Sequence, residues 1–222
     1  MISIAIDGPG GAGKSTIAKA LAKKLGFIYV DTGALYRAIG LYMINNGVDL
    51  KNAAAVTEKL DEVKVELKYV NGEQRVLLCG DDVSEDIRKP EVSMAASDVS
   101  AIPAVRDFLL GLQRKMASEN NVIMDGRDIG TVVLPNAQIK LFLTASAEER
   151  AMRRYKELIE KGKKVEYETV YKELCERDYQ DSHREVAPLK PADDSTIIDT
   201  TGNNLEKSVQ VLTDFILPKL EK

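Results

Sequence analysis

The sequence predicts an α/β fold with a central parallel β-sheet flanked by helices. Short apolar runs of strand length alternate along the chain with longer segments in which apolar residues recur at helical spacing. The first apolar run leads into a glycine-rich loop, and this loop opens the first helical segment. Strands that alternate with helices pair in parallel through right-handed crossovers. We therefore expect one sheet whose strands are covered by helices on both faces.

Five apolar runs are the candidate strands of this sheet. They are short, continuous and bounded by polar residues or turn signals, which is typical of strands buried on both faces. They lie at residues 2–6, 27–30, 121–125, 139–145 and 196–200.

The helical segments carry their own boundary signals. Gly26 is expected to end the first helix as a C-cap, and Pro103 to begin a later one. Ser146 caps the next helix in a capping box with Glu149. The expected helices lie at 14–25, 34–45, 90–100, 103–117, 147–160, 166–180 and 205–220.

Residues 63–80 follow a different pattern. The segment "VKVELKYV" alternates apolar and polar residues, Asn71-Gly72 is a hairpin turn signal, and "RVLLC" is a return strand. This stretch predicts a small antiparallel unit, half exposed, inserted into the α/β pattern.

Size and composition narrow the class of protein. The 222 residues suffice for one well-buried domain with a moderate insert. The net charge of −4 disfavours nucleic acid as a partner, because its phosphate backbone selects basic proteins. Cys79 and Cys175 form no Cys-x-x-Cys pair, and the single histidine, His183, adds little, so a zinc site is disfavoured. With no signal-peptide pattern and no charge-free stretch of roughly 20 residues, we expect a cytoplasmic protein without a membrane partner.

The stretch "GPGGAGKST" forms a phosphate-binding loop. It fits Gly-x-x-x-x-Gly-Lys-[Ser/Thr] and lies between a buried strand and a helix. The glycines let backbone N–H groups turn toward phosphate oxygens, and the helix points its positive end at them. Lys14 is expected to reach the β- and γ-phosphates, and Ser15 to bind Mg²⁺. The expected ATP-binding residues are Gly8, Pro9, Gly10, Gly11, Ala12, Gly13, Lys14, Ser15 and Thr16.

Two places later in the chain suit an acceptor that carries a phosphate. In "DTGALYR", Thr32 and Gly33 would lie at a helix N-terminus, with Arg37 one turn further on. A capped surface helix with an exposed arginine explains these residues equally well. Arg106 falls in the first turn of a helix, where a cation is unfavourable, so either a bound anion or simple exposure to solvent accounts for it.

Two consecutive helices place charged residues on one side each. These residues are Arg150, Arg153 and Arg154 on the first helix and Arg177, Asp181 and Arg184 on the second. A solvated face with salt bridges is the ordinary explanation of such spacing. Because the helices are consecutive and joined by "GKK", we favour a mobile cationic flap that neutralises a transferred phosphate and excludes water.

Taken together, these stretches resemble the bacterial cytidylate kinases, a family of nucleoside monophosphate kinases. The resemblance covers essentially the whole chain and rests on "DGPGGAGKST", "DTGALYRAIG", "SAIPAVRDFLLGLQR", "DGRDIGTVVLP", "ASAEERAMRR" and "ERDYQDSHREVAPL". It implies transfer of the ATP γ-phosphate to CMP or dCMP with Mg²⁺, giving CDP or dCDP and ADP. It also implies a P-loop kinase fold with a CORE, an NMP-binding domain that carries the antiparallel insert, and a helical LID.

The resemblance further implies roles for single residues. Thr32 stands where some members have serine, so the hydroxyl is kept. The implied substrate-binding residues are Thr32, Arg37, Ser97, Arg106, Arg127, Asp128, Arg177, Asp181 and Arg184. The implied catalytic residues are Lys14, Arg150, Arg153 and Arg154.

The segment "VIMDGRDIG" contains candidate residues for both the metal and the acceptor. Asp125 ends a buried strand, the usual position of an acid near Mg²⁺, so we expect it to act with Ser15 as a metal ligand. Arg127 and Asp128 follow and suit a cytosine edge, because a carboxylate accepts from the amino group and a guanidinium donates to O2 or N3. An ordinary polar turn is the alternative.

The expected division of the chain follows these assignments. We expect a CORE at 1–31, 104–149 and 187–222, an NMP-binding domain at 32–103 with its insert near 63–84, and a LID at 150–186. No long exposed apolar stripe is evident, so we expect a monomer. Three alternatives remain: a kinase of another small acceptor such as UMP or a shikimate-type substrate, a nucleotide-dependent binding protein without an acceptor, and a P-loop protein that binds nucleic acid.

Overall fold

The computed structural model describes residues 1–220 and contains a five-stranded sheet and a separate three-stranded sheet. The larger sheet has the spatial order β2-β6-β1-β7-β8. Its strands are β1 (Ser3–Asp7), β2 (Ile28–Asp31), β6 (Val122–Gly126), β7 (Ile139–Thr144) and β8 (Thr196–Asp199). β1 pairs in parallel with β6 and with β7, and β7 pairs in parallel with β8. The predicted α/β fold on a parallel sheet is confirmed, since the strands coincide with the five apolar runs.

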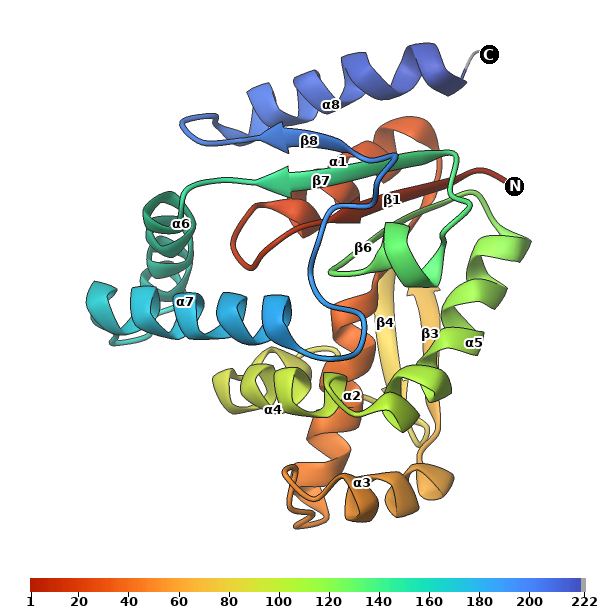
Figure 1. The fold of residues 1–222 in the computed structure, drawn as a ribbon, viewed down its shortest axis with the longest axis vertical. Coiled ribbons are helices and arrows are strands. Elements are labelled where there is room, and N and C mark those ends of the chain that lie inside the picture. Colours follow the sequence, from red (N-terminus) through yellow and green to blue (C-terminus); the bar gives the residue numbers. More distant parts are fainter. Residues whose placement is uncertain (221–222) are drawn as a thin grey trace. The chain divides into compact units, whose positions relative to one another are not determined.

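The chain forms two compact units, and the first combines Met1–Tyr29 with the chain from Glu119 onward. Its helices are α1 (Lys14–Leu25), α6 (Ala147–Glu160), α7 (Tyr167–His183) and α8 (Leu205–Leu220). α1 and α8 pack against each other beside the sheet, and α6 and α7 lie side by side (Figure 1). The core includes Ile4, Leu21, Leu141 and Leu212, all fully buried. Burial of each such side chain contributes roughly 1.5–3 kcal/mol.

The carboxyl ends of β1, β6 and β7 meet at one edge of this sheet because the strands are parallel. The register places Asp7 opposite Gly126 of β6 and Phe142 of β7. The glycine-rich loop, the segment after Gly126 and the start of α6 therefore leave the sheet at the same edge. Ligands of open α/β sheets bind outside this edge.

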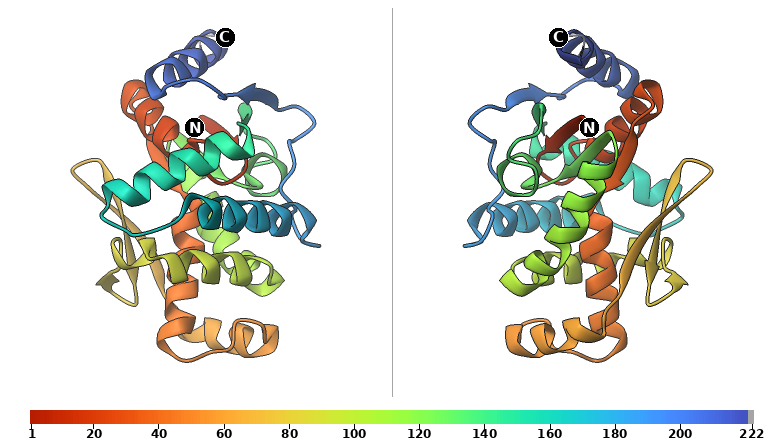
Figure 2. Two further views of the ribbon diagram at one scale, coloured as in Figure 1. Left: turned by 90° about the vertical axis from the view of Figure 1, so that its left-hand side faces the viewer. Right: turned by 90° about the vertical axis from the view of Figure 1, so that its right-hand side faces the viewer.

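The second unit comprises Val30–Ser118. It contains α2 (Thr32–Asn45), α3 (Ala53–Lys59), α4 (Pro90–Ser100), most of α5 (Pro103–Glu119), and two 3₁₀ turns, Leu60–Glu62 and Asp86–Arg88. β3 (Val65–Val70), β4 (Glu73–Leu78) and β5 (Asp81–Asp82) form its antiparallel sheet. Figure 2 shows β3 and β4 as a twisted ribbon. Asn71 and Gly72 have φ of 54° and 80°, which confirms the predicted hairpin turn.

Three local features were not predicted. α3 was missed because Val56 is its only buried residue, so it carries no apolar periodicity. α7 ends at His183 instead of near residue 180. Residues 129–133 form a π-helical turn whose first two N–H groups are held from a distant part of the chain, as described below. Among residues 1–220, no helix is both long and apolar enough to span a bilayer.

Candidate active site

The glycine-rich loop has the backbone that phosphate binding requires. Gly8 and Gly11 have φ of +146° and +74°, a region that L side chains rarely adopt. A Cβ on Gly8 would collide with the carbonyl oxygen of Leu143, and one on Gly11 would lie 2.9 Å from the carbonyl oxygen of Arg150. These two glycines therefore let the loop pack against β7 and α6 while its N–H groups remain turned toward the edge of the sheet.

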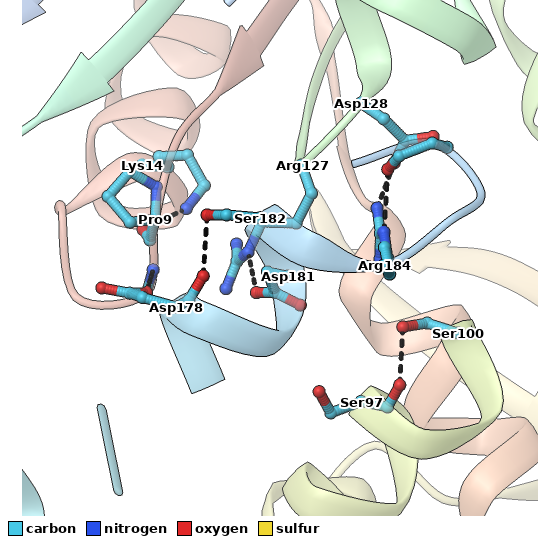
Figure 3. A network of polar contacts seen from close by, with 12 residues as sticks. Pro9, Lys14, Ser97, Ser100, Arg127, Asp128, Asp178, Asp181, Ser182 and Arg184 are labelled. Carbon is cyan, nitrogen blue, oxygen red and sulfur yellow. Dashed lines mark hydrogen bonds and ion pairs between the residues drawn. The ribbon is translucent and has the colours of Figure 1, made fainter. Parts of the chain in front are cut away.

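Lys14 is buried at the start of α1. Its Nζ donates to the carbonyl oxygen of Pro9 within the same loop, at 2.8 Å (Figure 3). Burial and the nearby guanidinium of Arg127 lower the pKa of Lys14 to about 7. Phosphate oxygens bound at the loop would add negative charge beside this buried ammonium group.

Ser15 at the start of α1 and Tyr29 within β2 both hydrogen-bond to Asp125 near the end of β6. Ser15 Oγ donates to Asp125 Oδ2, and Tyr29 Oη donates to Asp125 Oδ1, each at 2.8 Å. Among the described residues, no group of three or more acidic, histidine or cysteine side chains is placed to hold a metal. A hydroxyl and a carboxylate beside a phosphate loop nevertheless suit Mg²⁺, which binds few protein ligands and keeps phosphate oxygens and water as the others. Tyr29, which orients the carboxylate, was not among the predicted site residues.

We expect Tyr29→Phe to raise the free Mg²⁺ concentration required for half-maximal rate by roughly tenfold, because a lost outer-shell hydrogen bond typically weakens metal binding by that much or more. The rate at saturating Mg²⁺ should change less, since the carboxylate itself remains. Titrating Mg²⁺ at saturating ATP measures both. Tyr42→Phe is the matched control, because it removes a hydroxyl that donates to Glu62 at 3.1 Å on the surface. If Tyr29→Phe has the same Mg²⁺ requirement as the wild type, Asp125 is not a metal ligand.

Two ion pairs join the segment after β6 to α7 and its C-cap. Arg127 Nε donates to Asp181 Oδ2 at 2.7 Å, and Arg184 lies 3.4 Å from Asp128 Oδ1 (Figure 3). Asp128 and Asp181 are both buried. Burial alone would raise the pKa of Asp181, but the guanidiniums of Arg127, Arg177 and Arg184 outweigh it and hold this pKa below its usual value. The structure therefore brings together four of the predicted residues as two pairs of opposite charge: Arg127 with Asp181, and Arg184 with Asp128.

Asp7 shapes the turn that carries Asp128. At the end of β1, its two carboxylate oxygens accept from the N–H groups of Ile129 and Gly130, both at 2.7 Å. Burial raises the pKa of Asp7 to about 6, although these two hydrogen bonds act against the shift. Asp7 was not among the predicted site residues. The one sequence feature that could have indicated this role is the position of Asp7 directly before the glycine-rich loop.

The predicted arginines of α6 divide into different environments. Arg150 is buried, and its NH1 donates to the carbonyl oxygen of Gly10 at 2.9 Å, so it lies at the glycine-rich loop. Arg153 donates to the carbonyl oxygen of Thr200 at 2.8 Å and pairs with Glu149. Arg154 pairs with Glu157 of its own helix at 2.8 Å. The structure therefore brings Arg150, but not Arg154, to the loop.

α7 also brings to the loop an acid that was not among the predicted site residues. Asp178 lies one residue after Arg177, and its carboxylate accepts from Gly10 N and from Arg150 NH1. Arg177 is half-buried, and its positive charge lowers the pKa values of both Lys14 and Asp181.

The other predicted residues lie in the second unit. α2 begins at Thr32, two residues before the expected start, and Thr32 and Gly33 lie at its N-terminus as predicted. Asp31 caps the helix by accepting from Ala34 N at 3.0 Å. Arg37 lies 4.0 Å from Asp31, and its buried Nε has no hydrogen-bond partner among the described residues. The capped helix of the alternative is present, but Arg37 is half-buried, with 26% of its side chain exposed.

Arg106 and Ser97 are also buried in the second unit. Arg106 NH1 donates to the carbonyl oxygen of Ser100 at 3.1 Å, and its guanidinium lies 5.5 Å from the centre of the Tyr36 ring. Ser100 Oγ in turn donates to the carbonyl oxygen of Ser97 at 2.8 Å (Figure 3). Simple exposure to solvent therefore does not explain Arg106.

A phosphate loop on a parallel sheet, an acid at the end of the neighbouring strand and a cluster of arginines are the parts that phosphoryl transfer uses. They define the class of P-loop phosphotransferases. Comparison with protein families is more specific, because the family model for cytidylate kinase matches residues 4–218. The chain belongs to the cytidylate kinase family.

Individual relatives agree with this assignment. The cytidylate kinase of Caldicellulosiruptor saccharolyticus is 54% identical over 214 residues, which are 96% of this chain and 95% of the relative. The cytidylate kinase of Streptococcus pyogenes serotype M18 is 48% identical over 222 residues, covering 100% of this chain and 96% of the relative. Among solved structures, an uncharacterized protein from Eubacterium ventriosum superposes with a TM-score of 0.55 at 13% identity, covering 97% and 98% of the two chains. That likeness concerns the fold alone.

Proposed function

We propose that this chain transfers the γ-phosphate of Mg²⁺-bound ATP to CMP or dCMP, releasing ADP and CDP or dCDP. Cytidylate kinase activity and the use of ATP follow from membership of the family. The observation that carries the acceptor site is the pairing of Arg127 with Asp181 and of Asp128 with Arg184 at the carboxyl edge of the sheet.

The donor side consists of residues 8–16 and Mg²⁺. In this proposal the loop N–H groups hold the phosphates and Lys14 bridges the β- and γ-phosphates. Ser15 and Asp125 hold Mg²⁺, which neutralises charge on the transferred group when bound. The 2.8 Å contact between Ser15 and Asp125 supports this role, since it brings two oxygen ligands together beside the loop.

The acceptor side is divided among phosphate, ribose and base. Arg37, whose Nε is buried without a partner among the described residues, and Thr32 are assigned to the acceptor phosphate. Ser97 and Arg106 are assigned to the same pocket as Thr32 and Arg37, and Asp128 and Arg127 are assigned to the cytosine edge. Arg177, Asp181 and Arg184 are assigned to ribose and base from the LID. Arg150, Arg153 and Arg154 are assigned to the transferred phosphate, with Arg150 best supported because it already touches the loop.

The remaining assignments complete the proposal. We keep the division into CORE, NMP-binding domain and LID at the boundaries given above, with 150–186 as the LID. A cytoplasmic location rests on the free thiols of Cys79 and Cys175. A monomer remains our prediction.

A coupled assay of ADP release with CMP, dCMP, UMP and AMP as acceptors tests the proposal. CMP and dCMP are expected to give kcat/KM values at least roughly tenfold above those of UMP and AMP, because a site with buried polar groups rejects an acceptor that leaves them unpaired. Equal kcat/KM values for UMP and CMP would show that the enzyme accepts pyrimidine nucleotides more broadly. Release of ADP that does not depend on any acceptor would support a nucleotide-dependent binding protein instead.

A further inference from the structure

Asp178 of α7 contacts the glycine-rich loop, and the proposed function gives it no role in phosphoryl transfer. Its Oδ1 accepts from Gly10 N at 3.3 Å, and its Oδ2 accepts from Arg150 NH1. Only 19% of its side chain is exposed. In Figure 3, Asp178 lies beside Pro9 of the loop.

The groups around Asp178 are those that such a loop offers to a phosphate. A backbone N–H of the loop and a guanidinium donate to its carboxylate, as they do to phosphate oxygens. Arg127 NH2 lies 3.6 Å from the position that a Cβ on Gly10 would take, so a second guanidinium is adjacent. The negative charges of Asp181, Asp178 and Asp125 raise the pKa of Arg127 against the effect of its burial.

The contact also determines what Arg150 does. With NH1 on Asp178 and on the carbonyl oxygen of Gly10, and Nε on the carbonyl oxygen of Ala145, its guanidinium is held by three acceptors. A buried arginine without an anion would be costly, so the carboxylate keeps Arg150 ordered beside the loop. A phosphate on the loop would take the same donors.

We propose that Asp178 is an internal competitor of the donor phosphates. In the enzyme without nucleotide it occupies Gly10 N and Arg150, and ATP displaces it and takes over both donors. Because the free energy of the Asp178 contacts is lost on displacement, the apparent affinity for ATP is lower than the loop alone would give. The proposal rests on the proposed function for the identity of the ligand.

Direct binding of ATP by calorimetry, without an acceptor, tests this inference. In Asp178→Asn the shape is kept and the charge removed, and in Asp178→Ala both contacts are lost. Both variants are expected to bind ATP roughly tenfold more tightly or better, the scale of one hydrogen bond to a charged group. Glu176→Gln is the matched control, because Glu176 lies on the same helix, is exposed and carries the same charge. A similar gain in Glu176→Gln would attribute the effect to net charge and overturn the proposal.

Melting temperatures with and without saturating ATP provide the second readout. Competition predicts that the variants melt below the wild type when empty and close to it when saturated, because ATP then supplies the partner of Arg150. Equal losses in both states, with unchanged ATP affinity, would show that Asp178 only supports Arg150 and would overturn the proposal. If Asp178→Ala does not fold, Asp178→Asn decides. Wild-type protein that binds no ATP would instead refute the proposed function itself.

Discussion

Replacing Lys14 by alanine is expected to leave the fold intact and to lower kcat by about 10²-fold or more, since loss of one charge-stabilising donor in an enzyme site has that scale. Within residues 1–220, Lys14 Nζ hydrogen-bonds to the carbonyl oxygen of Pro9 in its own loop, so its removal costs no hydrogen bond to another helix or strand. The pKa of about 7 indicates that the folded chain holds this ammonium group at a cost, which bound phosphates would offset. Stability should therefore change little while catalysis falls.

Steady-state rates at saturating ATP and CMP, with circular dichroism as the check on folding, measure this effect. Lys23→Ala is the matched control, because Lys23 lies in the last turn of the same helix and is exposed. A Lys14→Ala enzyme with a normal spectrum and a near-wild-type rate would refute the donor site.

Replacing Asp128 by asparagine is expected to narrow the preference for CMP over UMP by roughly ten- to a hundredfold, because a hydrogen bond to a charged group is typically worth about 1.5–3 kcal/mol. Cytosine presents an amino group where uracil presents a carbonyl. A carboxylate accepts from the first and repels the second, whereas an asparagine amide can donate to uracil. The ratio of kcat/KM for CMP to that for UMP should therefore fall, because CMP binds less well and UMP binds better.

The structure indicates why the variant should fold. Arg184 lies 3.4 Å from Asp128, and it also donates from Nε to the carbonyl oxygen of Ala187 at 2.8 Å, so it keeps one partner and an amide oxygen nearby. The measurement is kcat/KM for CMP and for UMP, with Asp193→Asn, an exposed acid, as the control. Equal losses for both acceptors would show that Asp128 does not read the base. It would then orient Arg184 or Arg127.

The strands and most helices were predictable because their signals are local. The run "ISIAI" is too short and too apolar for anything but a buried strand, and Asn71-Gly72 selects one kind of turn by its backbone alone. α3 was not predictable, since a seven-residue helix with one buried side chain leaves no period to detect. The glycine-rich loop was predictable because residue types at fixed spacing determine its chemistry.

The arginines of α6 show what residue spacing cannot predict. Spacing placed Arg150, Arg153 and Arg154 on one side of α6, yet Arg150 contacts Gly10 while Arg154 pairs with Glu157. The difference arises because neighbours three or four residues apart still point several tens of degrees away from one another, and only packing decides which of them meets the loop. The same holds for Asp178, which no spacing rule distinguishes from the other acids of α7.

By itself, the sequence determined the parallel sheet, the phosphate loop with Lys14 and Ser15, and the resemblance to the cytidylate kinases. Each depends on residues that are neighbours in the chain. The tertiary structure alone decided that Tyr29 orients Asp125, that Asp7 holds the turn at Ile129 and Gly130, and that Asp178 occupies Gly10 and Arg150. These contacts join residues about 100 or more positions apart, except the one between Asp178 and Arg150. The physical reason is that hydrogen-bond partners of buried polar groups are selected by which strand ends and helices the fold brings to one edge.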